Sequence, residues 1–178
     1  MYNSSAGRAA SQSSSSTVGE KITEDQVTNL LSVLRTDASV ETKVGLFNSI
    51  KSGIKHNNVP EPGVATLFEA IRTAMSSQHT GLVYAGFSTL NHLLMRLSRQ
   101  EPRHLQREAA RTLPLVLEKS GDQHKNFKKC ATECLETFWM NKGAAVEVER
   151  IIKNVGLTGK SPRIKETLMQ WIALVQTP

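Results

Sequence analysis

The chain has 178 residues, of which 39% are hydrophobic, and its formal net charge of +6 corresponds to a pI of about 9.5. This length suits one domain with a continuous core and is short for two ordinary domains. The sequence has neither a long apolar run of the transmembrane kind nor an N-terminal signal peptide, so we expect a soluble intracellular protein. The positive charge predicts an acidic partner, which on charge alone is a protein, a nucleic acid or an anionic membrane.

The composition also indicates the fold class and a division of the chain. Aromatic residues make up 5% of the sequence, and the apolar residues are mostly Leu, Val, Ile and Ala, which suit closely stacked helices and predict an all-α fold. Residues 1–19 are mostly Ser, Ala and Gly, with little apolar content to offset the entropy of ordering. We expect them to form a disordered, low-complexity leader before a folded domain over residues 20–178.

The first two expected helices begin at residues that cap helix N-termini. Thr23, with Gln26 three residues later, completes a capping box before an apolar run that ends near Arg35. Ser39 caps a second helix, which ends before Pro60 because proline cannot continue it. The two helices are joined by a short polar turn and therefore form a helical hairpin.

Three further hairpins follow along the chain. Their expected helices cover residues 63–75 and 81–97, 101–119 and 126–140, and 144–155 and 162–175. Gly81 and Gly86 are poor helix formers, but with Ala85 they are small enough for neighbouring helices to approach closely. We therefore expect residues 81–97 to form a helix despite these glycines.

The second helix of each hairpin carries the same apolar stripe, at positions i, i+3 and i+7. The stripe residues are Phe47, Ile50 and Ile54; Phe87, Leu90 and Leu94; Ala131, Cys134 and Phe138; and Leu168, Trp171 and Val175. A pattern of helix pairs that returns about every forty residues is typical of HEAT and armadillo arrays. The sequence thus predicts an α-solenoid of about four HEAT-like hairpins. The last helix has more apolar residues than one buried stripe requires, so we expect further repeats in a longer parent chain.

In a stack of hairpins, the turns inside the units line up along one narrow edge, and here they are expected at residues 36–40, 77–81, 119–125 and 157–163. Basic residues gather in the last two turns and the adjoining helix starts: Lys119, Lys125, Lys128, Lys160, Arg163 and Lys165. Lys and Arg also form the ordinary solvated face of helices, which is the alternative explanation. Their recurrence at corresponding positions of successive repeats favours a partner-binding role.

The sequence offers no pattern typical of an enzyme. Cys130 and Cys134 lie four residues apart in a layer otherwise filled by Leu and Phe, which favours reduced core thiols over a metal or redox pair. The five histidines are scattered, and none is paired with an acid or Cys at catalytic or metal-ligand spacing. The stretch Gly156–Ser161 ends like a Walker motif but lacks its first glycine and a preceding strand. We therefore expect no catalysis, no cofactor and no metal.

Several stretches resemble a known family. Residues Gly159–Ile172 resemble the fourth-repeat turn and helix of TOG domains, with a basic-Pro-basic pattern that leads into a Leu and a Trp. Gly121, Asp122, Lys125 and Phe127 are similar to the third-repeat turn of the same domains. Stretches similar to the first TOG-like domain of fungal CLASP proteins, the cytoplasmic-linker-associated microtubule regulators, cover residues 20–30, 54–61, 67–72 and 107–114. The resemblance extends over about residues 20–176.

This resemblance implies a paddle of HEAT repeats whose turn edge binds αβ-tubulin, typically through an aromatic residue in the first turn and basic residues in later turns. In this chain the first turn, residues 36–40, has no aromatic residue, and Trp139 and Trp171 both lie at core spacing on second helices. Aromatic side chains are among the strongest hot spots of protein interfaces. The edge is therefore expected to rely on its basic residues.

The resemblance implies a non-catalytic, microtubule-associated binding module of a CLASP-type regulator of microtubule dynamics and the mitotic spindle. It would dock to tubulin, to microtubules or to a kinetochore protein through the turns, on the cytoplasmic cytoskeleton at the spindle or, in closed mitosis, in the nucleus. The alternative is a HEAT-repeat interaction scaffold that does not bind tubulin. A nucleic-acid partner is disfavoured because Tyr2 and Tyr84 are not placed in a basic stripe, and no membrane partner is expected.

Overall fold

A computed structural model of the protein describes residues 20–176, in which the chain forms helices packed as antiparallel pairs. The predicted all-α, HEAT-like array is confirmed. The expected leader over residues 1–19 lies outside the described residues. The α-helices are α1 (Glu24–Leu34), α2 (Val40–His56), α3 (Val64–Met75), α4 (Thr80–Gln100), α5 (Arg103–Ser120), α6 (Lys125–Met140), α7 (Lys142–Ile151) and α8 (Pro162–Gln176).

Two short segments complete the described chain: a 3-10 turn, η1 (Glu61–Gly63), before α3 and a π-helical segment, η2 (Ile152–Leu157), after α7. No helix in residues 20–176 is both long and apolar enough to cross a bilayer.

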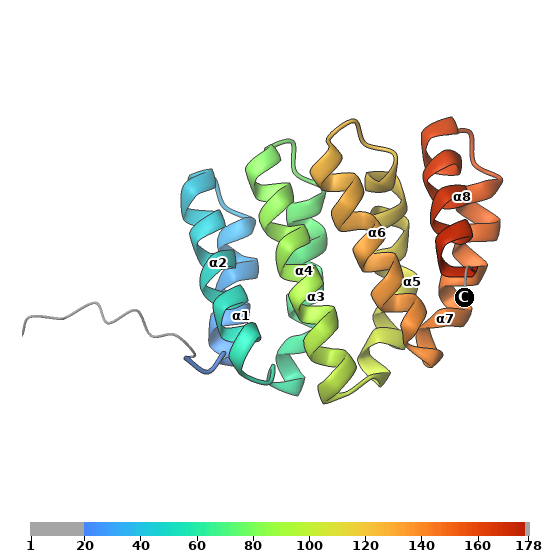
Figure 1. Ribbon diagram of the computed structural model, residues 1–178. Coiled ribbons are helices and arrows are strands. Elements are labelled where there is room, and N and C mark those ends of the chain that lie inside the picture. The colour runs from blue at the N-terminus through green and yellow to red at the C-terminus, as the bar shows by residue number, and fades with distance from the viewer. Residues whose placement is uncertain (1–19, 177–178) are drawn as a thin grey trace, which may run out of the picture.

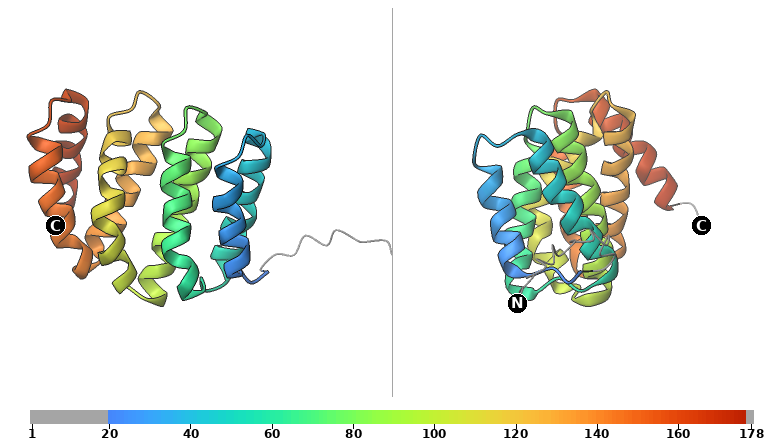
Figure 2. Two further views of the ribbon diagram at one scale, coloured as in Figure 1. Left: turned by 180° about the vertical axis from the view of Figure 1, so that it is seen from behind. Right: turned by 90° about the vertical axis from the view of Figure 1, so that its left-hand side faces the viewer.

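The hairpins stack side by side in two layers (Figure 1). The helices α2, α4 and α6 lie next to one another in one layer, and α1, α3, α5 and α7 form the other, as the view from behind shows (Figure 2). We call these layers the second-helix face and the first-helix face. Because each hairpin contacts its neighbours, the layers enclose one continuous core.

Polar side chains begin several of these helices, as the sequence predicts. Thr23 and Gln26 form the expected capping box at α1, and the Ser39 side chain accepts a hydrogen bond from the backbone N–H of Thr42 at α2. Asn141 caps α7 in the same way through the Ala144 N–H. Each cap satisfies a backbone donor that the helix itself leaves unpaired, and so fixes where the helix starts.

The predicted apolar stripes form the core between the layers. Every stripe residue of the first three second helices is buried: Phe47, Ile50, Ile54, Phe87, Leu90, Leu94, Ala131, Cys134 and Phe138. The phenyl rings of Phe87 and Phe127 stack with centroids 6.4 Å apart and join the second and third hairpins. Burial of large apolar side chains at this spacing supplies the main driving force for stacking the repeats.

The two glycines near the start of α4 have different roles. A Cβ atom at Gly86 would lie 3.0 Å from the Ala74 Cβ and 3.3 Å from the Ile71 carbonyl oxygen, so glycine permits the close approach of α3 and α4. The prediction that Gly81 also permits a close approach of helices is wrong, because a Cβ atom at Gly81 would meet nothing within 4 Å.

The last helix departs from the regular stack. Helix α8 packs mainly against α5 and η2, and its C-terminal end turns away from the other helices (Figure 2). As a result Trp139 on α6 is 37% exposed, which corrects the expectation that it lies in the core. Its ring meets the buried Trp171 edge-on, with centroids 6.1 Å apart. Val175, the last stripe residue, is only partly buried.

Candidate docking rim at the helix turns

The four turns that join the helices of each hairpin lie along one edge of the molecule, at the top of Figure 1 and of both views in Figure 2. They connect α1 to α2, α3 to α4, α5 to α6 and η2 to α8. We call this edge the turn rim. The common edge follows from antiparallel pairing and regular stacking, because equivalent ends of successive hairpins must then lie side by side.

The third turn is ordered by its own polar side chains. The backbone N–H of His124 donates to Asp122 Oδ1 at 2.9 Å, and the His124 ring nitrogen Nδ1 lies 2.8 Å from the same oxygen. The backbone N–H, the ring and the nearby Lys119 hold the pKa of the Asp122 carboxyl below its usual value. Lys119 Nζ lies 6.0 Å from the centroid of the Phe127 ring, within the range of a cation–π contact.

The third and fourth turns are fastened to each other. The Thr167 hydroxyl on α8 donates to the backbone carbonyl of Ser120, at the end of α5, over 3.0 Å in a buried position. A Cβ atom at Gly121 would lie 2.7 Å from Ile164 Cγ1, so glycine allows α8 to approach the turn closely. Ser161 accepts a hydrogen bond from the Ile164 N–H and helps to begin α8.

Two of the predicted binding residues share one hollow of the turn rim. Lys128 and Arg163 line a depression of about 380 Å³ between the third and fourth turns, together with the acidic residues Asp122 and Glu166. Carboxylates therefore lie among the cations at this end of the rim. An acidic partner would have to present its carboxylates to the lysines and arginines individually.

The other predicted residues are distributed around this hollow. Lys125 lines a neighbouring depression of about 360 Å³ between the second and third turns. Neither Lys160 nor Lys165 lines these two hollows, although both lie in the fourth hairpin at the rim. Lys125, Lys160 and Arg163 are exposed, whereas Lys119, Lys128 and Lys165 are partly buried.

Tyr84 lies at the turn rim beside basic residues, although the sequence did not predict it to belong to a basic stripe. It is 47% exposed and lines the same depression as Lys125 and His124. The rim thus carries an exposed tyrosine side chain, although this lies near the second turn and not in the first. A signal was present in the sequence, since Tyr84 is the fifth residue of α4, close to the rim end of that helix.

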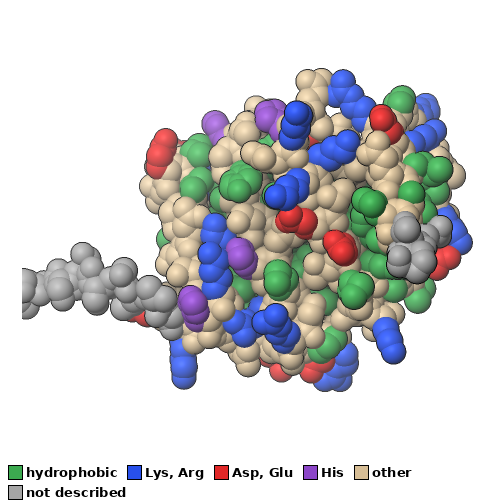
Figure 3. All heavy atoms as spheres, viewed as in Figure 1, with side chains coloured by type: hydrophobic (Ala, Val, Ile, Leu, Met, Phe, Trp, Pro, Cys, Tyr) green, Lys and Arg blue, Asp and Glu red, His purple; other side chains and the backbone are tan. Residues whose placement is uncertain are grey.

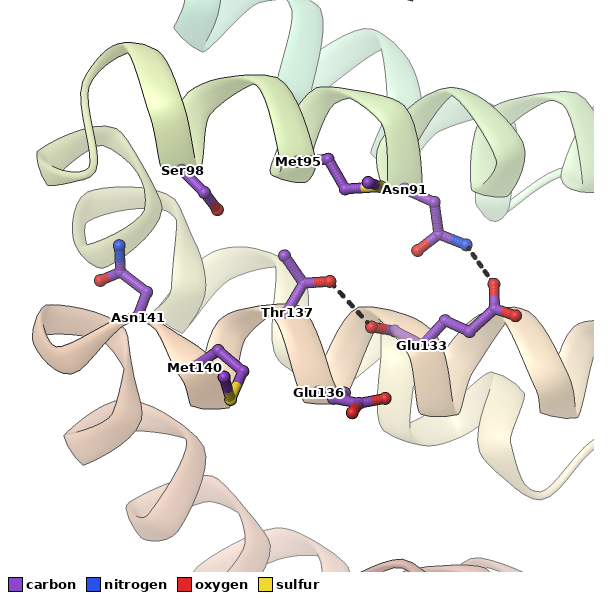
Figure 4. Close-up of a pocket in the computed structure, with 8 residues that line it drawn as sticks. All are labelled: Asn91, Met95, Ser98, Glu133, Glu136, Thr137, Met140 and Asn141. Atoms are coloured by element: carbon purple, nitrogen blue, oxygen red, sulfur yellow. Dashed lines mark hydrogen bonds between the residues drawn. The ribbon is translucent and has the colours of Figure 1, made fainter. Parts of the chain in front are cut away.

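A depression of about 460 Å³ lies on the second-helix face, between α4 and α6. Figure 4 shows the Asn91 side chain directed at Glu133, and its amide nitrogen donates to the Glu133 carboxylate over 3.3 Å. The methyl ends of Met95 and Met140 are exposed beside it. This arrangement brings together no nucleophile and base of a catalytic kind. Within residues 20–176, no group of three or more His, Cys, Asp or Glu side chains could hold a metal ion.

The two thiols are placed differently. Cys134 is fully buried and donates to Asn91 Oδ1 over 2.8 Å, as expected of a core thiol, whereas Cys130 is only partly buried. Burial raises the pKa of Cys130, and it raises the pKa of Cys134 well above the usual value, with additional contributions from neighbouring Glu133. Both groups are therefore thiols and not thiolates near neutral pH.

Comparison with known proteins identifies the family. The family model described as the CLASP N-terminal domain matches residues 23–177. The chain is 48% identical over 155 residues to protein stu-1 of Neurospora crassa, a match that covers 87% of this chain and 14% of that protein. It is 51% identical over 152 residues to protein STU1 of Gibberella zeae, which covers 85% of this chain and 13% of that protein.

A third relative, protein stu1 of Aspergillus fumigatus, is 40% identical over 156 residues, with 86% of this chain and 12% of that protein covered. No solved structure matches the chain. The chain thus spans about one seventh of the length of the curated relatives that it matches most fully. It belongs to the CLASP N-terminal family, a non-catalytic family of microtubule regulators.

Proposed function

We propose that this domain is a microtubule-associated binding module of a CLASP-type regulator, which docks to tubulin, microtubules or a kinetochore protein through the turn rim. The observation that carries the proposal is the alignment of the four turns on one edge, with Lys128 and Arg163 lining one hollow there. The stacked helices fix the spacing of the backbone positions that carry these cations, so the backbone of the rim need not become ordered when an acidic surface binds. The family's role in microtubule regulation supports tubulin or a microtubule-bound protein as the partner.

The basic residues assigned to docking are those predicted from the sequence: Lys119, Lys125, Lys128, Lys160, Arg163 and Lys165. Exposed cations attract an acidic partner over roughly 8 Å at physiological ionic strength, which accelerates association and weakens as salt rises. The proposed site of action is the cytoplasmic cytoskeleton at the mitotic spindle, or the kinetochore inside the nucleus where mitosis is closed.

The test is charge reversal on the rim. In the Lys160→Glu, Arg163→Glu double variant we expect co-sedimentation with microtubules to weaken at least about fivefold at low salt. The matched control is Arg107→Glu, Arg111→Glu, which reverses two exposed charges one helical turn apart on α5, on the first-helix face. Equal binding by the rim variant and the unmodified chain would refute rim docking.

A second candidate function is an interaction scaffold that does not bind tubulin, and one observation favours it. The first turn has no aromatic side chain, and the exposed Trp139 lies elsewhere, in a groove of about 290 Å³ with Trp171, Leu157 and Val175. Gel filtration with αβ-tubulin at low salt, compared with pelleting on polymerised microtubules, separates the two functions. A scaffold would leave the tubulin peak unshifted and would not pellet.

We further propose that more HEAT repeats of the parent protein follow α8. The side chains of Met169 and Leu174 are 60% and 74% exposed, and the groove beside Trp139 is mostly apolar. In a repeat array, such an apolar end is covered by the next hairpin. A longer chain that includes the next hairpin should therefore unfold at a higher temperature than this one.

A further inference from the structure

A strip of basic side chains lies on the second-helix face, between α2 and α4 and away from the residues assigned to docking on the turn rim. We call it the basic strip, and it consists of Lys51, Lys55, His56, His92, Arg96 and Arg99. Figure 3 shows Lys, Arg and His side chains gathered over the lower part of these two helices. None of the residues assigned to rim docking belongs to it.

The two helices that carry the strip are held in register by its own members. Lys51 Nζ donates to the Ser88 hydroxyl on α4 over 3.3 Å. The Arg96 guanidinium on α4 donates to the backbone carbonyls of Ile54 and Lys55 on α2, at 2.9 and 2.7 Å. These contacts cross between consecutive hairpins, so Lys51 and Arg96 are anchored where the two helices meet.

Neither helix that carries the strip supplies an acidic residue within it. Helix α4 contains no Asp or Glu, and the only acid of α2 is Glu41 in its first turn. None of the ion pairs among residues 20–176 includes a strip residue. Burial and, after it, the nearby Lys55 lower the pKa values of Lys51 and His92, and Lys51 also acts on His92. Lys51 and Lys55 therefore repel each other, and a bound anion would relieve that repulsion.

We propose that the basic strip is a second docking surface, which binds a carboxylate-rich polypeptide segment in extended conformation. Its elongated form is the reason for this choice of partner. From Ser88 to Arg99 the α4 backbone rises about 16 Å, which matches about five residues of extended chain. Charges spread over this length fit successive carboxylates of an acidic segment better than a single multivalent anion.

The strip and the turn rim are separable surfaces. The hollow of the rim that contains Lys128 and Arg163 also contains Asp122 and Glu166, whereas no acidic residue belongs to the strip. An acidic segment therefore meets fewer carboxylates at the strip than in this hollow of the rim. A partner bound at the rim and a flexible acidic segment of the same or another protein could engage the domain together.

The experiment uses the 178-residue chain with the rim already reversed by Lys160→Glu and Arg163→Glu, so that failure of rim docking does not affect the result. Binding of a fluorescein-labelled hexaglutamate peptide is measured by fluorescence anisotropy at low salt. We expect the further change Lys51→Glu, Lys55→Glu to weaken binding at least about tenfold, and Lys51→Gln, Lys55→Gln to weaken it by a smaller factor. Adding Arg107→Glu, Arg111→Glu instead should change binding by less than about twofold.

A second readout reports on the location of binding. The ring proton resonances of His92, assigned with His92→Gln, should shift when the peptide is added, and circular dichroism should show unchanged helix content in every variant. Equal weakening by the strip and control variants, or an unperturbed His92 ring, would overturn the proposal. A hexathymidylate that displaces the peptide at equal concentration would overturn it in favour of a nucleic-acid site.

Discussion

The hydroxyl of Thr167 donates to the backbone carbonyl of Ser120, 47 residues earlier in the chain, over 3.0 Å in the buried interior. This bond joins the start of α8 to the end of α5 directly beneath the third and fourth turns. It therefore couples the two turns whose basic residues are proposed to dock a partner. A contact of this kind is tertiary, because neither residue has a local reason to bind the other.

Thr167→Val should destabilise the domain, because the variant keeps the shape of the side chain but leaves the buried Ser120 carbonyl without its donor. We expect a loss of about 1–2 kcal/mol in the free energy of unfolding, measured by urea denaturation. Thr137→Val is the control, since the Thr137 hydroxyl bonds only within its own helix to the Glu133 carbonyl. An equal loss of unfolding free energy in both variants would show that the Thr167–Ser120 bond stabilises the domain no more than a hydrogen bond within one helix.

Substitution of two glycines by alanine should have opposite effects on stability. Gly121→Ala places a methyl group 2.7 Å from Ile164 Cγ1 and must push α8 away, at a cost of about 1–3 kcal/mol. Gly81→Ala meets open space near the start of α4 and should stabilise the domain by about 0.5 kcal/mol, because it restricts the unfolded chain. Thermal unfolding of the two variants measures the difference, and a stabilised Gly121→Ala would contradict the close approach described here.

Two ion pairs join the first helices of successive hairpins, but only one is buried. Arg72 Nη1 contacts Glu108 Oε2 at 3.0 Å with the Glu108 side chain 3% exposed, whereas the Arg35–Glu69 pair at 2.7 Å is about half exposed. Glu108→Gln should cost about 2–3 kcal/mol, because it leaves the Arg72 charge largely buried without a counter-ion. Glu69→Gln should cost less than about 1 kcal/mol. Chemical denaturation gives both values, and comparable losses would contradict the role of burial.

The stability of the domain should fall between pH 7.5 and 5.5 in part because of His92. Burial and the nearby lysines lower its pKa in the folded state, so the unfolded state binds more protons in this range and stability rises with pH. The stability that depends on a neutral His92 is fully present above the pKa of this side chain in the unfolded state. It is lost as the pH falls through the unfolded-state pKa toward the lower folded-state pKa. His92→Gln should therefore show a smaller loss of unfolding free energy at pH 5.5 than the unmodified chain. If His92→Gln and the unmodified chain lose the same unfolding free energy between pH 7.5 and 5.5, His92 is not a cause of the pH dependence.

Cys130 should be alkylated slowly in the native protein, and Cys134 more slowly still. The thiolate is the reactive form, and burial raises both pKa values, most for the fully buried Cys134. Peptide mapping by mass spectrometry after limited iodoacetamide treatment at pH 7.5 distinguishes the two sites. In urea both should react at similar rates, and rapid native labelling of Cys134 would contradict its place in the core.

Much of the array could be predicted from the sequence because its signals are local. Stripes such as Phe87, Leu90 and Leu94 recur at helical spacing, and residues such as Thr23 and Ser39 satisfy helix N-termini within three residues of themselves. The repeat of hairpins then places the turns on one edge, since antiparallel pairs of similar length can stack in few other ways.

The sequence alone determined that the protein is a stack of helical hairpins, and which residues lie in its turns. The tertiary structure decided which distant side chains meet: Lys128 with Arg163 in one hollow, Lys51 with Ser88 across two helices, and Trp139 at an exposed edge beside Trp171. The physical reason is that helix periodicity fixes the direction of a side chain only relative to its own helix. Contacts between helices depend on how closely the helices approach, as at Gly86 and Gly121, and on the divergence of α8.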